Sequence, residues 1–253
     1  MNYSIIVPAW NEEALLGDTL AALREAMRDV DDGGRHSGEL IVVDNNSTDA
    51  TADVARTAGA RVVFEPVNQI ARARNAGAAQ ASGEALVFID ADTTIESALL
   101  ASVLERLGSG QVVGGGATIA ADREVSGAAA AGLAFWNRIS RLASYAAGCC
   151  VWCRRDAFES VGGFSTRVYA GEEIYLSRAL KRWGRANGMR FEILGAPPVR
   201  TSTRKLDWYG PLGMARQAAM VFIPGALSSK RLMKTWYDDD GRAADRDERR
   251  PPD

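Results

Sequence analysis

Short runs of apolar residues alternate along the chain with longer segments in which apolar residues recur every three or four positions. The runs cover residues 4–7, 40–43, 61–64 and 86–89, and the periodic segments between them cover about 15–23, 50–58 and 70–81. Runs of this length predict buried strands, and a spacing of three and four predicts helices. Their alternation predicts βαβ units and a mostly parallel sheet.

The second half of the chain continues with less regular elements. We expect helices over 99–107 and 128–147, a short helix from Asp156, and a helix after Glu173. Strands are expected over 111–119, 149–153 and 190–194. The first of these strands is interrupted by three glycines.

Polar residues follow three of the predicted strands at the point where each strand ends. They occupy positions 8–12, 44–49 and 90–92. We expect Pro8 to end the first strand and Asn11 to cap the helix that follows. Because right-handed crossovers place the carboxyl ends of parallel strands at one edge, these residues should line one crevice.

The motif Asp90-Ala91-Asp92 gives this crevice a specific chemistry. In an extended chain the two carboxylates project to the same side, where they repel unless a cation or a proton separates them. Oxygen ligands favour Mg²⁺ or Mn²⁺, which commonly bridge one or two carboxylates to substrate phosphates. The alternative is a solvated turn whose aspartates cap a helix beginning near Ile95.

Composition narrows the possible classes of protein. The 253 residues, 47% of them hydrophobic, fit one large domain or a core domain with a C-terminal extension, and a net charge of −2 argues against nucleic acid as a partner. Three cysteines and a single histidine, His36, form neither a disulfide framework nor a zinc set. Without a signal-peptide pattern or a bilayer-length apolar stretch, we expect a cytoplasmic protein.

Five motifs in order carry a resemblance to a known family. They are the residues 7–13 (VPAWNEE), 42–49 (VVDNNSTD), 73–77 (ARNAG), 88–92 (FIDAD), and Gly162-Gly163-Phe164 before Glu172-Glu173. Over about residues 4–184 the chain resembles family 2 glycosyltransferases. The resemblance implies the GT-A fold, a Rossmann-like three-layer αβα sandwich with a mostly parallel central sheet. It also implies a nucleotide-sugar-binding and catalytic domain over 1–200; we expect a helical extension over 201–236 and a charged, disordered tail over 237–253.

The resemblance also implies roles for individual residues. The first-strand loop contacts the nucleoside, Asp44 reads the base edge, Arg74 lies near the nucleotide, and Asp90 and Asp92 bind the ribose and the divalent ion. Asn45 stands where many members carry a second Asp. The full set of implied nucleotide-sugar contacts is Pro8, Ala9, Asn11, Glu12, Asp44, Asn46, Arg74, Asp90, Ala91, Arg204 and Lys205.

Glu172 and Glu173 match the acidic pair that supplies the family's candidate general base. A carboxylate must accept the proton of the acceptor hydroxyl, and a single displacement with such a base inverts the anomeric centre. The sequence does not decide between the two glutamates, and retention of configuration stays an alternative. Charge compensation at a helix N-terminus is the simpler interpretation of both residues.

Cationic and aromatic residues late in the chain complete the predictions. Arg204 and Lys205 are either clamps over the diphosphate or a solvated basic turn. Arg72 and Arg74 cannot both face inward. The aromatic residues Trp208, Tyr209 and Trp236 suggest an acceptor groove or a membrane surface, and residues 214–227 suggest an interfacial segment or a buried helix.

The predicted activity is metal-dependent, inverting transfer of a sugar from a nucleotide-diphosphate sugar, with Mg²⁺ or Mn²⁺ as cofactor. The acceptor is a hydroxyl or phosphate on a lipid phosphate, a glycan or a small molecule. Peripheral contact with the inner face of the membrane is the alternative to a purely cytoplasmic location. A sugar-phosphate nucleotidyltransferase is disfavoured because no Gly-rich basic loop follows the first strand. A nucleotide-binding pseudoenzyme is the third interpretation.

Overall fold

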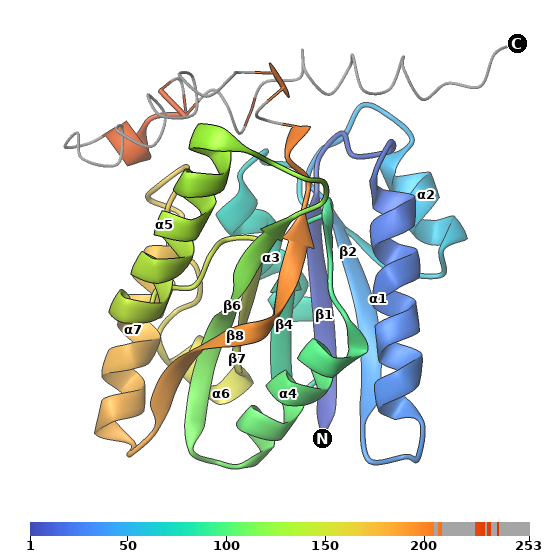
Figure 1. The fold of residues 1–253 in the computed structure, drawn as a ribbon. Helices are drawn as coiled ribbons and strands as arrows, with labels where there is room; N and C mark the ends of the chain where they lie inside the picture. Colours follow the sequence, from blue (N-terminus) through green and yellow to red (C-terminus); the bar gives the residue numbers. More distant parts are fainter. Residues whose placement is uncertain (205–206, 209–225, 231, 234–236, 238–253) are drawn as a thin grey trace, which may run out of the picture.

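The structure is a computed structural model that describes residues 1–204, 207–208, 226–230, 232–233 and 237. An eight-stranded sheet with the order β3-β2-β1-β4-β7-β6-β8-β5 forms its centre, and helices cover both faces (Figure 1). The predicted three-layer αβα architecture is confirmed.

The first half of the chain builds the parallel part of the sheet. Strands β1 (Asn2–Ala9), β2 (Ser37–Asp44), β3 (Arg61–Phe64) and β4 (Ala85–Ile89) pair in parallel, with β1 between β2 and β4. Helices α1 (Leu16–Asp31), α2 (Thr51–Thr57) and α3 (Ile70–Gln80) connect them. Because all four strands run the same way, the ends of β1, β2 and β4 lie together.

The second half makes the sheet mixed. Strand β7 (Cys150–Arg154) runs antiparallel to both β4 and β6 (Val112–Ala121), while β8 (Arg190–Thr201) is parallel to β6. A two-residue strand, β5 (Thr93–Thr94), pairs antiparallel with the end of β8. This pairing places Thr201 beside the residue that follows Asp92.

Two apolar clusters fill the space between the sheet and its helices. One packs α1 and α4 (Ser97–Gly108) on one face, through residues such as Leu20 and Leu100. The other packs α3, α6 (Arg155–Ser160) and α7 (Glu172–Ala186) on the opposite face, through residues such as Phe158 and Leu176. Helix α5 (Gly127–Ala143) lies against β6 and β8.

The three glycines of β6 have a steric reason. A Cβ at Gly115 would collide with the carbonyl oxygen of Glu192 on β8 and with the indole of Trp152 on β7. The buried Trp152 therefore fits only because β6 carries no side chain at this position.

Several predicted boundaries are wrong for local reasons. Pro8 does not end β1: pairing with β4 stops at Ile6, but pairing with β2 continues to Ala9, because proline lacks only its own N–H. Asn11 has a left-handed backbone (φ 52°) and does not cap α1, which begins at Leu16. Strand β8 extends to Thr201 through register shifts in its pairing with β6.

Two further boundaries also differ. Helix α5 ends at Ala143, because Ser144 adopts a left-handed conformation (φ 51°). The alternative role of Asp90 and Asp92 as helix caps is wrong, since α4 begins at Ser97 with Glu96 at its N-cap position.

Among the described residues, no helix combines the length and apolar character that crossing a membrane requires.

Candidate active site

The predicted crevice is present where β1 and β4 end. Its open volume is about 590 Å³, and its lining combines residues from both strand ends with residues brought from elsewhere in the chain. The lining residues are Pro8, Ala9, Trp10, Glu12, Asn45, Asn68, Ile70, Asp90, Ala91, Asp92, Arg204 and Tyr237. Six of the predicted nucleotide-sugar contacts are in this set: Pro8, Ala9, Glu12, Asp90, Ala91 and Arg204.

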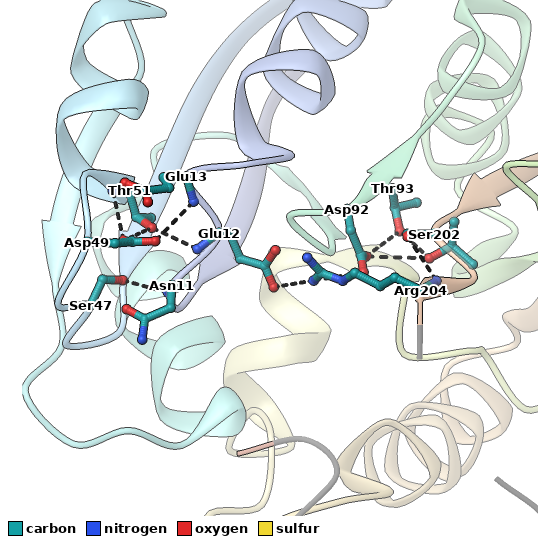
Figure 2. A network of polar contacts seen from close by, with 11 residues as sticks. Asn11, Glu12, Glu13, Ser47, Asp49, Thr51, Asp92, Thr93, Ser202 and Arg204 are labelled. Carbon is teal, nitrogen blue, oxygen red and sulfur yellow. Dashed lines mark hydrogen bonds and ion pairs between the residues drawn. The ribbon is translucent and has the colours of Figure 1, made fainter. Parts of the chain in front are cut away.

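Hydrogen bonds join the loop after β1 to the loop after β2 (Figure 2). The backbone N–H of Asn11 donates to Ser47 Oγ (3.1 Å), and that of Glu12 donates to Thr51 Oγ1 (2.8 Å). The N–H of Glu13 donates to Asp49 (3.2 Å). Asn11 is buried and accepts the N–H of Thr48 (2.8 Å), so it fixes the loop that carries Glu12.

Residues 44–46, at the end of β2 and just after it, differ in burial and in role. Asp44 is buried, and its carboxylate accepts the N–H of Ser47 at 2.9 Å. Asn45, at the position of the second Asp of many family members, donates to the carbonyls of Glu65 and Val67. Asn46 has a left-handed backbone and an exposed side chain and is not among the lining residues.

Arg74 on α3 lies at the centre of a buried charge cluster. Its guanidinium donates to Glu172 Oε1 (2.6 Å), to Asp90 Oδ1 (2.7 Å) and to the carbonyl of Gly148 (2.7 Å). Its side chain is only 1% exposed and packs over the ring of Phe164. Arg72, two residues earlier, instead points outward and pairs with Glu65 at 3.1 Å, as the helical spacing predicts.

The two candidate bases, Glu172 and Glu173, begin α7 and differ in their partners. Glu172 is buried and paired with Arg74. Within the described part of the chain, Glu173 forms no ion pair. Removal from water, followed by the neighbouring charge of Glu172, raises the pKa of Glu173 well above that of an ordinary glutamate. Both residues also lie in the first turn of a helix, where the macrodipole favours negative charge.

Arg204 forms a second cluster on the other side of Asp92 (Figure 2). Its guanidinium donates to Glu12 Oε1 at 2.5 Å and to Asp92 Oδ2 at 3.3 Å, and it packs over the indole of Trp208. Hydroxyls of Thr93 and Thr201 lie at 3.4 and 3.5 Å from Asp92 Oδ1. The predicted solvated turn at Arg204 is therefore wrong, because this side chain is 8% exposed. Lys205 lies outside the described residues.

The carboxylates suit a divalent cation that also binds a substrate. The described residues contain no group of three or more His, Cys, Asp or Glu side chains arranged to hold a metal ion. Mg²⁺ and Mn²⁺ sites formed with a nucleotide need only one or two carboxylates, because phosphates and water complete the coordination. Asp92 fits such a role better than Asp90, since its contact with Arg204 is longer (3.3 Å) than the contact of Asp90 with Arg74 (2.7 Å).

Sequence reasoning missed three residues of the crevice wall, which are Asn68, Ile70 and Tyr237. Asn68 lies between β3 and α3 and places a buried side-chain oxygen there. Its place after a predicted strand was a usable signal. The hydroxyl of Tyr237 donates to the carbonyl of Tyr169, 68 positions earlier in the chain, and nothing in the local sequence indicates this contact.

A mixed, mostly parallel sheet flanked by helices, with paired carboxylates where a parallel strand ends, is the arrangement expected of the GT-A fold. The sequence model of the family described as "Glycosyl transferase family 2" matches residues 4–162, more than half of the chain. The chain therefore belongs to glycosyl transferase family 2.

Curated relatives carry glycosyltransferase names. The chain is 36% identical over 107 residues to an uncharacterised glycosyltransferase of Mycobacterium tuberculosis, which is 42% of this chain and 44% of the relative. It is 35% identical over 107 residues to validoxylamine A glucosyltransferase of Streptomyces hygroscopicus (40% and 24%). It is 26% identical over 212 residues to the glycosyltransferase AglE of Haloferax volcanii (78% and 67%). The match thus spans less than half the length of the first of these relatives.

Solved structures confirm the fold. Glucosyl-3-phosphoglycerate synthase of M. tuberculosis, in complex with Mn²⁺, UDP and glucosyl-3-phosphoglycerate, is similar with a TM-score of 0.61 at 23% identity, covering 88% of this chain and 78% of that one. S. aureus TarS 1–349 in complex with UDP-GlcNAc gives a TM-score of 0.61 at 18% identity, covering 94% and 72%. The mannosyltransferase PcManGT of Pyrobaculum calidifontis, in complex with GDP-Man and Mn²⁺, gives 0.60 at 18% identity, covering 99% and 76%.

Proposed function

We propose that the protein transfers a sugar from a nucleoside-diphosphate sugar to a hydroxyl or phosphate of an acceptor, with inversion of the anomeric centre. The observation that carries this proposal is the position of Asp90 and Asp92. They end β4 in an open crevice, and each is contacted by a buried arginine from a different side. The family membership supports the same reaction class.

The crevice offers separate surfaces for the two halves of a donor. Pro8, Ala9 and Asn68 form a wall of backbone and amide groups that suits a nucleoside. Asp92 and Arg204 offer a carboxylate and a guanidinium side by side, which suits a diphosphate with its cation. A bound Mg²⁺ or Mn²⁺ would stabilise the negative charge of the leaving diphosphate. Solved structures of the same fold with Mn²⁺ and UDP, or with Mn²⁺ and GDP-Man, support this cofactor class.

Glu173 is the better of the two candidate bases. Glu172 is already engaged in a short ion pair with Arg74, so its carboxylate is held by a structural partner. The raised pKa of Glu173 makes its carboxylate a stronger base than an ordinary glutamate. Glu173 would accept the proton of the acceptor nucleophile as that oxygen attacks the sugar, and Arg74 would keep the neighbouring carboxylates in place.

The test is a thermal-shift panel of nucleoside diphosphates and nucleotide sugars, each with Mn²⁺ or with a chelator. A ligand at a hundred times its dissociation constant stabilises a protein by about 2.7 kcal/mol. We expect a metal-dependent shift with one class of nucleotide, and its loss in Asp92→Asn. Asp49→Asn is the matched control, because Asp49 belongs to the loop network and is not among the residues lining the crevice.

Product assays with the same ligands separate the alternative functions. Transfer or slow hydrolysis of the bound nucleotide sugar supports the glycosyltransferase. Pyrophosphate release from a nucleoside triphosphate and a sugar phosphate would support a nucleotidyltransferase. Donor binding without any product, across a broad set of acceptors, would support a pseudoenzyme. A metal-dependent shift that persists in Asp92→Asn would contradict the proposed metal ligand.

A further inference from the structure

Helix α5 presents an apolar outer surface to solvent. Phe135, Ile139 and Leu142 are 65%, 37% and 77% exposed, and their spacing of four and three places them on one stripe of the helix. Of the 17 residues of α5, only Ser140 is buried by the described structure. A helix with this many large apolar residues normally covers them, and an exposed stripe of this kind marks a surface for a partner.

Two arginines lie beside this stripe on α5. Arg138 and Arg141 are exposed on α5 and, within the described residues, form no ion pair. We call Phe135, Arg138, Ile139, Arg141 and Leu142 the α5 face. Phe135, Arg138, Arg141 and Leu142 of this face also line a groove between α5 and the strands β6 and β8, together with residues that include Thr118, Gly195 and Pro198.

The neighbouring helix α7 extends the positive charge. Lys181 on α7 donates to the carbonyl of Ala143 at the end of α5 (2.8 Å), and Arg178 donates to the hydroxyl of Tyr145 (3.1 Å). After Glu173, the rest of α7 carries four cations and no acid: Arg178, Lys181, Arg182 and Arg185. Helix α5 itself carries no acidic residue. Helix α7 therefore brings cations to the C-terminal end of α5, although the whole chain has a net charge of −2.

We propose that the α5 face docks on the surface of an anionic lipid bilayer. Large apolar side chains beside arginines on one exposed helix are the features that hold a helix in the interface of an acidic membrane. The described structure contains no helix that spans a bilayer, so this contact is peripheral. The proposal does not concern residues 214–227, the segment with interfacial character in the sequence, which lie almost wholly outside the described residues.

Charge distinguishes a membrane from the other possible occupants. A symmetric pair of chains joined through the α5 face would bring Arg138 and Arg141 of both copies together, and the like charges would repel. A nucleic acid would satisfy the arginines but would leave Phe135 and Leu142 exposed to water. An acidic bilayer satisfies both, because its headgroups pair with the arginines while its acyl region accepts the apolar side chains.

The experiment is flotation of the full chain with two kinds of vesicle, one of phosphatidylcholine alone and one of phosphatidylcholine with 30% phosphatidylglycerol. We expect binding to the acidic vesicles only, weakened by salt. The double variant Arg138→Glu/Arg141→Glu should lower the partition coefficient at least about thirtyfold, since each arginine near an acidic surface contributes about fivefold. Phe135→Ser/Leu142→Ser should lower it about a hundredfold, because two large apolar side chains no longer enter the interface.

Matched controls separate the α5 face from general effects of charge and hydrophobicity. Arg28→Glu/Arg35→Glu makes the same change in net charge with exposed arginines elsewhere, and Phe64→Ser removes an exposed aromatic (59%) from β3. These controls should bind like the unmodified chain. Circular dichroism verifies that each variant folds.

Three results would overturn the proposal: no binding of the folded chain to acidic vesicles, equal loss of binding in the controls, or unchanged binding in both α5 variants. A dimer in solution that either α5 variant dissociates would assign the face to a second copy of the chain and would also overturn it. The readout does not involve sugar transfer, so its failure is distinct from a failure of the proposed activity.

Discussion

Two arginines contact the Asp90–Asp92 pair from opposite sides, and their surroundings differ. Arg74 comes from helix α3 inside the sheet-and-helix core, pairs with two carboxylates at 2.6 and 2.7 Å, and also donates to a backbone carbonyl. Arg204 comes from the chain just after β8, has one short ion pair with Glu12, and reaches Asp92 at 3.3 Å. The first arginine is enclosed by the core, whereas the second lines the open crevice.

The two arginines therefore differ in role: Arg74 is a fixed cation, whereas Arg204 can change its contacts. Arg74 is 1% exposed and makes two short ion pairs, so it holds Asp90 and Glu172 in place. The carboxylates around Arg204 face the crevice, so a divalent cation and a diphosphate can take its place or share its contacts. Four experiments test this comparison.

The largest effect is expected from Arg74→Met. This substitution leaves the carboxylate of Glu172 buried without its partner, and breaking a buried pair in this way costs about 3–5 kcal/mol of unfolding free energy. Urea denaturation measures the loss. Arg72→Met is the control on the same helix, and its partly exposed pair with Glu65 should contribute at most about 1 kcal/mol. Equal losses in the two variants would contradict the structural role of Arg74.

Glu173→Gln should lower kcat at least about a hundredfold with little change in donor affinity, because positioned general bases contribute at least this factor. Once donor and acceptor are known, steady-state kinetics and a binding isotherm give the two values. Glu172→Gln provides the contrast, since it should destabilise the fold by breaking the pair with Arg74. If Glu173→Gln retains full kcat, the base is elsewhere.

Arg204→Met should weaken binding of the nucleoside diphosphate about tenfold, the value of one lost charge-assisted contact of about 1.4 kcal/mol. Its effect on unfolding free energy should be smaller than that of Arg74→Met, because Arg204 makes one short ion pair, with Glu12, and a longer contact with Asp92. Calorimetric titration measures the affinity, and Arg204→Lys should restore part of it. Tighter binding in Arg204→Met would mean that this arginine blocks the donor site instead of completing it.

The last prediction concerns the pH dependence of stability. The pKa of Glu173 is raised in the folded state above the ordinary value of 4.5, so the folded protein binds more protons than the unfolded chain in the range above that value. The stability contributed by this group is therefore fully present below about pH 4.5 and is lost as the pH rises through the folded-state pKa. Glu173→Gln should become more stable relative to the unmodified chain between about pH 5 and about pH 8, measured by urea denaturation. A constant difference across this range would contradict the raised pKa.

The sequence by itself determined the elements that depend on local pattern. The apolar runs at 40–43, 61–64 and 86–89 are strands because their residues must be removed from water, and the helices between them follow the same rule. The placement of Pro8, Glu12, Asp90 and Asp92 in one crevice also followed from the sequence, because parallel strands bring their carboxyl ends together. The five motifs were sufficient to indicate the family.

Only the tertiary structure decided which charged groups are paired. Glu172 and Glu173 are adjacent in the sequence and equivalent by pattern, yet Arg74, 98 residues before Glu172, pairs with Glu172. Arg204 meets Glu12 across 192 residues, a contact that no local periodicity encodes. The energy of a charge depends on its distance from other charges and on its removal from water, and both are set when distant segments pack together. The sequence predicted a helix over 128–147. Only the fold revealed that this helix, α5, ends at Ala143 and leaves Phe135 and Leu142 exposed.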